Sequence, residues 1–581
     1  MNNKDTWKRL LRYASRYHST TLWAVLSAIL SVIASLIGPL LIGRAVDHMV
    51  GAGAVNFSAL GLLLIGLAIV YALGSLFGWL LIYLTNRIAY QTVYEMRRQL
   101  FDQMNILPLQ YHDSHPQGDS ISRFVNDMDA VSDGMIQGFS TLITGIVTIV
   151  GAIVFMLYIS PMMTLVTLIS APISFYVARF ITTRSQSLFR EQAEIVGGLN
   201  GYVEEMIGGQ KVVQAFQYEE RSFTHFAERN EALYHAGVKS QFLGSLSNPA
   251  TRLVNNMTFS VIAMIGSVAV ILGTITVGEL SSFLIFSNLF AKPFTEITGV
   301  LTQLQAATAS AQRIFSVLDL TPEQPDTEQA LQLKQSKGTI TFDKVRFAYD
   351  PERPLITNFS LEVKPGTRIA IVGQTGAGKT TLVNLLMRFY DVDGGSISID
   401  GVNINDMTRD SLRQNFGMVL QETWLYGASI RDNIAYGKSG ATDEEVIAAA
   451  KAANAHSFIK RLPEGYDTLI TGAGGGGNLS QGQEQLLTIA RVMLVDPPML
   501  ILDEATSSID TRTEIRIQKA FQKMIVGRTS FVIAHRLSTI READLILYMK
   551  NGDIVESGSH EQLLESGGHY AGLYNSQFTT A

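Results

Sequence analysis

Three long stretches of this chain contain no Asp, Glu, Lys or Arg, and they constrain its fold more than any other feature. They cover residues 17–43, 48–86 and 134–178. A helix needs roughly 20 apolar residues to cross a bilayer, so each stretch is long enough for a transmembrane helix. The third is long enough for two helices, which we expect to be separated at Ser160-Pro161.

Two further apolar stretches, at about residues 253–274 and 280–301, bring the predicted number of spans to six. Their orientation follows from the basic residues, because short cytoplasmic loops are enriched in Lys and Arg. Basic residues precede span one and lie between spans two and three and between four and five, whereas the other turns contain none. We therefore expect a multi-pass membrane protein with both termini in the cytoplasm.

The segments next to the spans also show a pattern. Trp7, Leu10, Leu11, Ala14 and Tyr17 share one helical face with basic residues between them, which is typical of a helix in the membrane interface. An amphipathic core helix is the alternative, but the apolar spans that follow argue against it.

The two long cytoplasmic loops keep helical spacing, so we expect two helical hairpins that extend the spans. The candidate contact points at their tips are Ser114–Val125 and Gly209–Phe216. A proline-marked polar stretch then separates the chain into a membrane domain at residues 1–320, a linker at 321–337 and a second domain at 338–581.

The composition agrees with this division and excludes other classes. The chain is 47% hydrophobic and only 17% charged, which suits a membrane protein. Its net charge of -6 gives no reason to expect nucleic acid as a partner. It has no cysteine, which excludes disulfides and thiolate metal sites.

The second domain contains a pattern for binding phosphate, G-x-x-x-x-G-K-[ST]. Residues 367–372 before it read as a buried strand and residues 382–388 after it as a helix, which is the order that such a loop requires. Glycines let backbone N–H groups turn inward, and the helix N-terminus adds partial positive charge. We expect Lys379 to reach the terminal phosphates and Thr380 to bind Mg²⁺. The stretch reads Gly373-Gln374-Thr375-Gly376-Ala377-Gly378-Lys379-Thr380-Thr381.

A glycine-rich turn without a ligand is the alternative, and a second motif argues against it. Residues 499–502 form an apolar run that ends in Asp503 and Glu504. Sites of phosphoryl transfer need a carboxylate for Mg²⁺ and a residue that orients the attacking water. Asp503 suits the first role and Glu504 the second, at the carboxyl end of a strand, where α/β sites form. The sequence therefore predicts a nucleoside triphosphate site.

Between these motifs lies Asn478-Leu479-Ser480-Gln481-Gly482-Gln483, followed by a predicted helix over residues 484–494. In combination with both phosphate motifs, this signature resembles the ATP-binding cassette (ABC) transporters, specifically the exporter half-transporters, over essentially the whole chain. The resemblance implies ATP and Mg²⁺ as cofactors and an ATPase coupled to transport. It implies a six-helix transmembrane domain with cytoplasmic helical extensions, fused to an α/β nucleotide-binding domain. It also implies that the signature of one chain, with Ser480, Gly482 and Gln483, closes over ATP held by another.

The resemblance assigns roles to further residues. Tyr349 matches the aromatic residue that stacks on adenine, and Gln421 matches the glutamine that contacts Mg²⁺ and water. Asp510 belongs to the loop that crosses the dimer interface, and His535 matches the histidine that contacts the γ-phosphate. Taken singly, a core tyrosine or a hydrogen-bonded histidine would be the ordinary interpretation, but the order and spacing of all four favour the family roles.

Two departures from the family pattern indicate whether the partner is a different chain or a second copy of this one. The signature has Gln481 where glycine is usual, and it continues Glu484-Gln485 in place of an arginine-rich run. The preceding glycine loop, residues 472–477, lacks the glutamate often found there. These features resemble the catalytically intact half of heterodimeric bacterial multidrug exporters. A heterodimer is therefore favoured, and a homodimer stays possible.

The function that follows is ATP-driven export of a hydrophobic or amphipathic small molecule across the lipid bilayer. The alternatives are a homodimeric lipid flippase and, from a different class, a gated channel or regulatory subunit that uses ATP as a signal. Glu504 and His535 favour hydrolysis. Lys292 and Glu296, spaced i,i+4 in the sixth span, are either a mutual ion pair or a functional pair in the membrane.

Overall fold

The computed structural model describes residues 3–49, 55–421, 423–470, 479–503, 509–534 and 537–578. The chain divides into two compact units. The first combines Met1–Leu107 with His115–Thr321, and the second combines Pro108–Ser114 with Pro322–Ala581.

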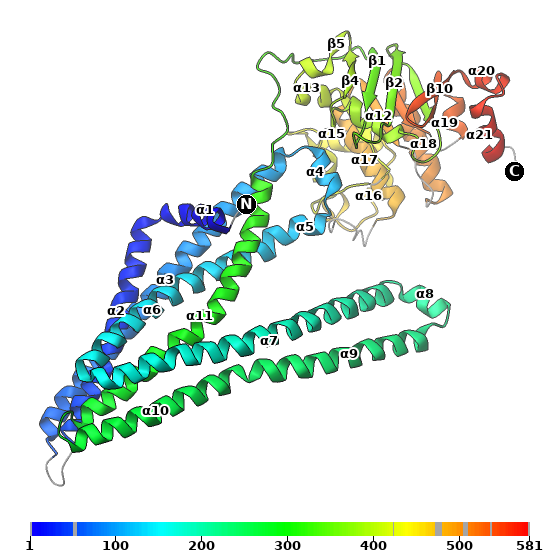
Figure 1. Ribbon diagram of the computed structural model, residues 1–581. Helices are drawn as coiled ribbons and strands as arrows, with labels where there is room; N and C mark the ends of the chain where they lie inside the picture. The colour runs from blue at the N-terminus through cyan, green and yellow to red at the C-terminus, as the bar shows by residue number, and fades with distance from the viewer. Residues whose placement is uncertain are drawn as a thin grey trace. The chain divides into compact units, whose positions relative to one another are not determined.

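The first unit is helical throughout its described residues (Figure 1). Five helical stretches are long and apolar enough to cross a membrane: His18–Asp47, Phe57–Ile106, Gln117–Ile159, Pro161–Gly208 and Glu219–Ile271. A sixth long helix, α11, has 42 residues. The predicted helical transmembrane domain is confirmed. Its elements are α1 (Asn3–Ser15), α2 (His18–Asp47), α3 (Phe57–Ile106), α5 (Gln117–Ser122), η1 (Arg123–Asp127), α6 (Met128–Ile159), α7 (Pro161–Gly208), α8 (Gln210–Ala215), α9 (Glu219–Ser245), α10 (Ser247–Ile271) and α11 (Val277–Leu318).

The C-terminal end of α2 packs tightly against the N-terminal end of α11. Gly43 and Gly278 face each other so closely that a Cβ on either would clash with the backbone of the other. Asp47 Oδ1 accepts from the backbone N–H of Gly278 at 2.7 Å, and Asp47 Oδ2 accepts from the Thr276 hydroxyl at 2.8 Å. The carboxylate therefore satisfies a donor at the start of α11, where negative charge is favourable.

Two long helical segments of this unit form a hairpin. Helix α7 runs beside α9 and α10, and the short helix α8 connects them at one end (Figure 1). At that end Phe216 is 79% exposed and Val212 is also exposed.

Within α11, Lys292 Nζ lies 3.6 Å from Glu296 Oε1. The two side chains therefore form a mutual ion pair, which was one of the two interpretations of this pair from the sequence.

The second unit contains two sheets. Its six-stranded sheet has the order β10-β9-β3-β8-β7-β6, and its four-stranded antiparallel sheet has the order β2-β1-β4-β5. The strands are β1 (Ile340–Phe347), β2 (Ile356–Val363), β3 (Arg368–Val372), β4 (Gly394–Ile399), β5 (Val402–Asn403), β6 (Phe416–Val419), β7 (Met499–Asp503), β8 (Thr529–Ile533), β9 (Leu545–Lys550) and β10 (Asp553–Gly558).

Helices complete this unit and bury its sheets in an α/β arrangement. They are α4 (Leu109–Ser114), α12 (Lys379–Leu386), η2 (Ile404–Asp406), α13 (Arg409–Gln414), α14 (Ile430–Ala435), α15 (Asp443–Ala452), α16 (His456–Ile459), η3 (Gly465–Asp467), α17 (Gln481–Val495), α18 (Thr511–Ile525), α19 (Leu537–Arg541), α20 (His560–Glu565) and α21 (His569–Phe578).

Helix α4 comes from the first of the two predicted cytoplasmic loops but belongs to the second unit. The Tyr390 hydroxyl donates to Asp113 Oδ2 at 2.6 Å. Burial and this carboxylate together raise the pKa of Tyr390, so the hydroxyl stays a donor. The contacting helix therefore ends at Ser114, the first residue of the stretch Ser114–Val125 that the sequence suggested as a tip.

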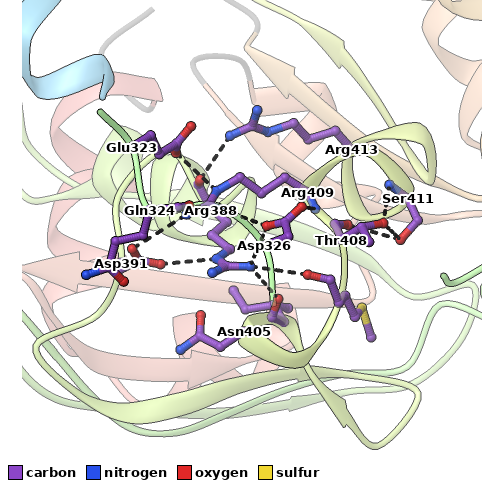
Figure 2. A network of polar contacts seen from close by, with 12 residues as sticks. Glu323, Gln324, Asp326, Arg388, Asp391, Asn405, Thr408, Arg409, Ser411 and Arg413 are labelled. Carbon is purple, nitrogen blue, oxygen red and sulfur yellow. Dashed lines mark hydrogen bonds and ion pairs between the residues drawn. The ribbon is translucent and has the colours of Figure 1, made fainter. Parts of the chain in front are cut away.

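The predicted linker is bound to the second unit by a buried guanidinium. Arg409, whose side chain is 8% exposed, donates through Nη1 to Asp326 Oδ1 at 2.7 Å and to the Gln324 carbonyl at 2.8 Å (Figure 2). Its backbone N–H also donates to Asp326 Oδ2 at 2.8 Å. Its Nε lies 3.1 Å from Glu323 Oε1, an ion-pair distance without hydrogen-bond geometry.

A second buried guanidinium ties the same carboxylate to the end of α12. Arg388 Nη1 lies 3.6 Å from Asp326 Oδ1 and donates to the carbonyls of Ile404 and Met407, while its Nε donates to Asp391 (Figure 2). We call Arg388, Arg409, Asp326 and Glu323 the linker clasp. It holds the segment that follows α11 in the sequence against the helix that begins at Lys379.

Replacing Arg409 by Ala should destabilise the second unit by about 3 kcal/mol, because the Asp326 carboxylate would lose its main partner in a buried setting. The full-length protein should show this as a lower unfolding midpoint of the second unit in denaturant. The matched control is Lys438→Ala, because Lys438 makes a more exposed pair with Glu445 and should contribute less than about 1 kcal/mol. Equal effects of both variants would contradict the clasp.

Candidate nucleotide site

The site depends on four neighbouring parallel strands whose carboxyl ends are aligned. Ile371 of β3 is paired with Ile533 of β8, which is paired with Asp503 of β7, and Leu502 of β7 is paired with Val419 of β6. The loops after these strands therefore leave the sheet at one edge. Gly373 follows β3, Asp503 ends β7 and Gln421 lies two residues after β6, so the register brings these three predicted site residues to one edge.

The first of these loops needs its glycines. Gly376 and Gly378 have φ of 83° and 94°, the left-handed region that L side chains rarely adopt. A Cβ on Gly373 would clash with the carbonyl of Met549. Gly378 precedes the first residue of α12, so the loop delivers its N–H groups to the N-terminus of that helix, where an anion is favoured.

Lys379 is folded back over this loop. Its Nζ donates to the carbonyls of Gly373 at 2.8 Å and Gln374 at 3.0 Å. Burial lowers the pKa of the Lys379 ammonium, and the negative charge of Asp503 opposes this shift. The charge of Asp503 thus acts on Lys379, as expected for two groups that serve the same phosphates.

Hard oxygen donors are available for the cation that phosphoryl transfer requires. Thr380 occupies the second position of α12, Asp503 ends β7 and Gln421 follows β6 on an exposed turn. Hydroxyl, carboxylate and amide oxygens are the ligands that Mg²⁺ prefers, and it keeps several waters and the phosphates as its other ligands. The chemistry of this donor set fits the ion.

Tyr349 belongs to a cluster of aromatic rings and contacts α12, the helix that follows the phosphate loop. Its ring makes edge contacts with Phe347 at 4.8 Å and Tyr390 at 5.0 Å between centroids, and its hydroxyl accepts from Asn384 Nδ2 at 3.2 Å. The side chain is 42% exposed, so part of the ring is open to a ligand. The sequence did not predict that Asn384 and Tyr390 hold it in place.

The signature lies at the start of α17. The Ser480 hydroxyl accepts from the backbone N–H of Gln483 at 3.4 Å, and the Gln483 side chain accepts from the N–H of Ser480 at 2.9 Å. This reciprocal cap uses the Gln483 side chain locally. A Cβ on Gly482 would lie 2.5 Å from Thr513 Cγ2 and 2.9 Å from Ile509 Cγ2, so the glycine permits close packing against the start of α18.

Asp510, the predicted interface residue, caps α18. Its Oδ1 accepts from the N–H groups of Arg512 at 3.1 Å and Thr513 at 3.0 Å. Hydrogen bonding from Thr513 is the main cause that lowers the pKa of Asp510, so its carboxylate stays ionised.

One contact that the sequence did not predict joins the signature helix to the glutamine loop. The Thr423 hydroxyl donates to Glu484 Oε2 at 3.1 Å, and Arg491 donates to the carbonyls of Trp424 and Asn433 at 3.3 and 2.9 Å. The sequence feature that could have indicated this contact was Glu484, which departs from the family signature. It is an acidic residue in the first turn of α17, where negative charge is favourable.

Two predicted catalytic residues, Glu504 and His535, lie outside the described residues. The strands that lead to them are described and end side by side. The glycine stretch 472–477 before the signature also lies outside.

Comparison with known proteins agrees with this geometry. Residues 21–294 match the ABC transporter transmembrane region, and residues 356–507 match the ABC transporter family. The chain is 43% identical over 523 residues to a fatty acid ABC transporter ATP-binding/permease protein of Mycobacterium bovis, which covers 90% of this chain and 82% of that protein.

A second relative and a solved structure extend the match. The chain is 38% identical over 495 residues to an ATP-dependent lipid A-core flippase of Syntrophus aciditrophicus, which covers 85% of this chain and 82% of the relative. It also resembles the structure of a bacterial Atm1-family ABC exporter with ATP bound, with a TM-score of 0.76, 31% identity, and coverage of 97% of this chain and 98% of the other. This chain belongs to the ABC transporter family.

More specifically, the chain is an ABC exporter in which a helical transmembrane domain and an ATP-binding domain are fused. It is an ATPase coupled to transport. Exporters of this kind work as dimers in a lipid bilayer.

Lys379→Met should remove the stabilisation that ATP confers on this ABC exporter, because we expect the Lys379 ammonium to bind the terminal phosphates. At an ATP concentration about 100 times its Kd, that stabilisation is roughly 2.7 kcal/mol. Without ATP, the variant should differ from the parent by less than about 1 kcal/mol, because the lost hydrogen bonds are offset by relief of a desolvated charge. Thermal unfolding with and without ATP measures both, with Lys364→Met, at an exposed position, as the control.

Proposed function

We propose that this exporter moves a hydrophobic or amphipathic compound outward across the bacterial cytoplasmic membrane, as one half of a dimer with two composite ATP sites. Both termini face the cytoplasm in this proposal, in accordance with the positions of the basic residues.

The observation that carries the proposal is the separation of the two phosphate-binding elements. Helix α12, with the phosphate loop, packs in a core that includes Ile369, Leu382 and Leu385, whereas α17, with the signature, packs in another that includes Leu486, Leu487 and Ile517. Each of these two hydrophobic cores thus supports one of the two elements that an ATP site needs. A signature from a second chain is therefore needed to close over ATP on this chain's loop.

The chain's own residues supply the hydrolytic half. Lys379 and the loop N–H groups hold the phosphates, Glu504 orients and deprotonates the attacking water, and His535 contacts the γ-phosphate. Thr380, Asp503 and Gln421 would hold Mg²⁺, which when bound neutralises charge that develops on the phosphate oxygens. A Glu504 beside a complete loop favours an ATPase over a channel that uses ATP only as a signal.

The membrane unit favours an amphipathic substrate. A small pocket between α7, α10 and α11 combines Phe175, Phe290 and Phe294 with hydroxyl and amide groups. In it the Ser174 hydroxyl donates to Asn255 Oδ1 at 3.1 Å. The named activities of the relatives, a fatty acid transporter and a lipid A-core flippase, support the same substrate class.

A heterodimer fits the departures of the signature better than a homodimer does. Gln481 and Glu484 lie on α17, the element that this chain contributes to its partner's site. The phosphate loop, Asp503 and Glu504 retain the family pattern. We therefore infer that hydrolysis takes place at the site built on this chain's Glu504 and that the other site holds ATP more persistently.

Glu504→Gln should retain ATP binding and lose more than about 95% of ATP hydrolysis, because an amide cannot accept the proton of the attacking water. Nucleotide-binding and phosphate-release assays on the same preparation separate the two properties. The control is Glu565→Gln at the exposed end of α20. Hydrolysis near the parent rate in Glu504→Gln would remove this residue from the mechanism.

Expressing this chain alone tests the pairing. We expect a weakly associated or poorly active species, because its own signature would have to cap both sites. Mass photometry gives the stoichiometry, and ATPase assays give the number of working sites. A stable homodimer with two equivalent, fully active sites would instead support the homodimeric lipid flippase.

A further inference from the structure

The membrane unit contains an apolar cavity of about 420 Å³ between the N-terminal helix α1 and helices α6 and α11. Its wall is formed by Trp7, Leu10 and Leu11 of α1, with Phe139 and Leu142 of α6 among the residues opposite. Protein interiors are close-packed, and an apolar cavity of roughly 150 Å³ already stays dry and takes up small hydrocarbons. A larger one at a membrane surface therefore calls for an apolar occupant.

Polar contacts hold α1 against the cytoplasmic end of α11. Arg9 forms a bidentate pair with Asp319 at 2.7 and 2.8 Å and lies over the Phe315 ring at 4.2 Å. Gln312 donates to the Asn3 side chain at 2.8 Å. These contacts fix the distance between α1 and the bundle.

The wall of the cavity opposite α1, which α6 and α11 form, is also held in place. Helices α6 and α11 already touch, since a Cβ on Gly134 would clash with Ala307 and a Cβ on Gly138 would lie 2.6 Å from Leu304 Cδ2. The cavity is therefore a consequence of two tight contacts that flank it.

Two exposed basic residues neighbour the cavity lining along α1. Leu11 lines the cavity and is 53% exposed, which places it at the opening. Lys8 and Arg12 follow the lining residues Trp7 and Leu11 directly and are exposed, and among the described residues no carboxylate lies within ion-pair distance of either. An interfacial helix with this pattern attracts anionic lipid.

We propose that this cavity is a binding site for an anionic phospholipid of the cytoplasmic leaflet, with one acyl chain beside Trp7 and the headgroup phosphate at Lys8 and Arg12. The lipid is a resident ligand of the membrane unit and is distinct from the transported compound. The proposal requires that the helices span a membrane and that no second copy of the chain fills the cavity, and it stands independently of the transported substrate.

Trp7 provides the probe, since the chain has only 4 tryptophans. A variant with Trp23→Phe, Trp79→Phe and Trp424→Phe, accepted if it retains ATP hydrolysis, is reconstituted in phosphatidylcholine vesicles. The vesicles contain a small fraction of brominated phosphatidylglycerol, phosphatidylcholine or free fatty acid. Brominated phosphatidylglycerol should quench Trp7 fluorescence at about a tenfold lower fraction than brominated phosphatidylcholine, as two cations beside one anionic headgroup imply.

Charge variants make the test specific. Lys8→Gln with Arg12→Gln should abolish the preference for phosphatidylglycerol, whereas Lys519→Gln with Lys523→Gln, an equal loss of charge on exposed α18, should preserve it. Equal quenching by both phospholipids would overturn the site, and so would stronger quenching by the fatty acid. Absence of quenching would show that protein fills the cavity, for example helices of a second copy, and would also overturn it.

A second measurement does not depend on the tryptophan replacements. Mass spectrometry of the detergent-purified parent should find phosphatidylglycerol retained at about one per chain. Leu142→Trp, which fills the cavity, should lower this at least several-fold. Leu62→Trp, on an exposed face of α3, should not. Equal retention in both variants would contradict the proposal.

Discussion

The nucleotide site depends on the parallel register of β6, β7, β8 and β3. Parallel strands that are buried on both faces must be apolar, and Ile369, Ile501 and Phe531 are each at most 1% exposed. With the strand ends aligned, the ends of the strands and the loops that follow them bring polar groups to one edge. One sheet thus gathers Gly373, Asp503 and the loop of Gln421 from segments separated by up to 130 residues of sequence (503 − 373).

Those features were predictable because each has a local cause. Charge-free stretches of membrane length read as spans, and a strand, a glycine loop and a helix in that order read as a phosphate site. The contacts that tie these parts together were not predictable, because they join residues far apart in the chain. The Tyr390–Asp113 hydrogen bond spans 277 residues, so a proline break near Pro108 predicted a turn but not the segment that makes contact. Glu504 and His535 stay predictions from their motifs.

The linker clasp is a second set of contacts that the sequence alone did not predict. A polar stretch with two prolines reads as a flexible linker, but burial of Arg388 and Arg409 is costly unless carboxylates accompany them. Asp326 therefore binds tightly to the second unit. Helix α12 begins at Lys379, and Arg388 follows its last turn. The segment that follows α11 in the sequence is thereby held to Arg388, which follows the last turn of α12.

The departures of the signature can be understood as local replacements. Glu484 lies in the first turn of α17, where its charge stabilises the helix, and it accepts from Thr423 of the glutamine loop. The residue that breaks the family pattern is therefore part of an intact structure in this chain. In the dimer that we propose, α17 serves the partner's site and α12 serves this chain's own, so a change confined to α17 would alter one composite site of a heterodimer but both sites of a homodimer. Under this proposal, an asymmetric pair is the assembly in which the signature can diverge without loss of hydrolysis at Glu504.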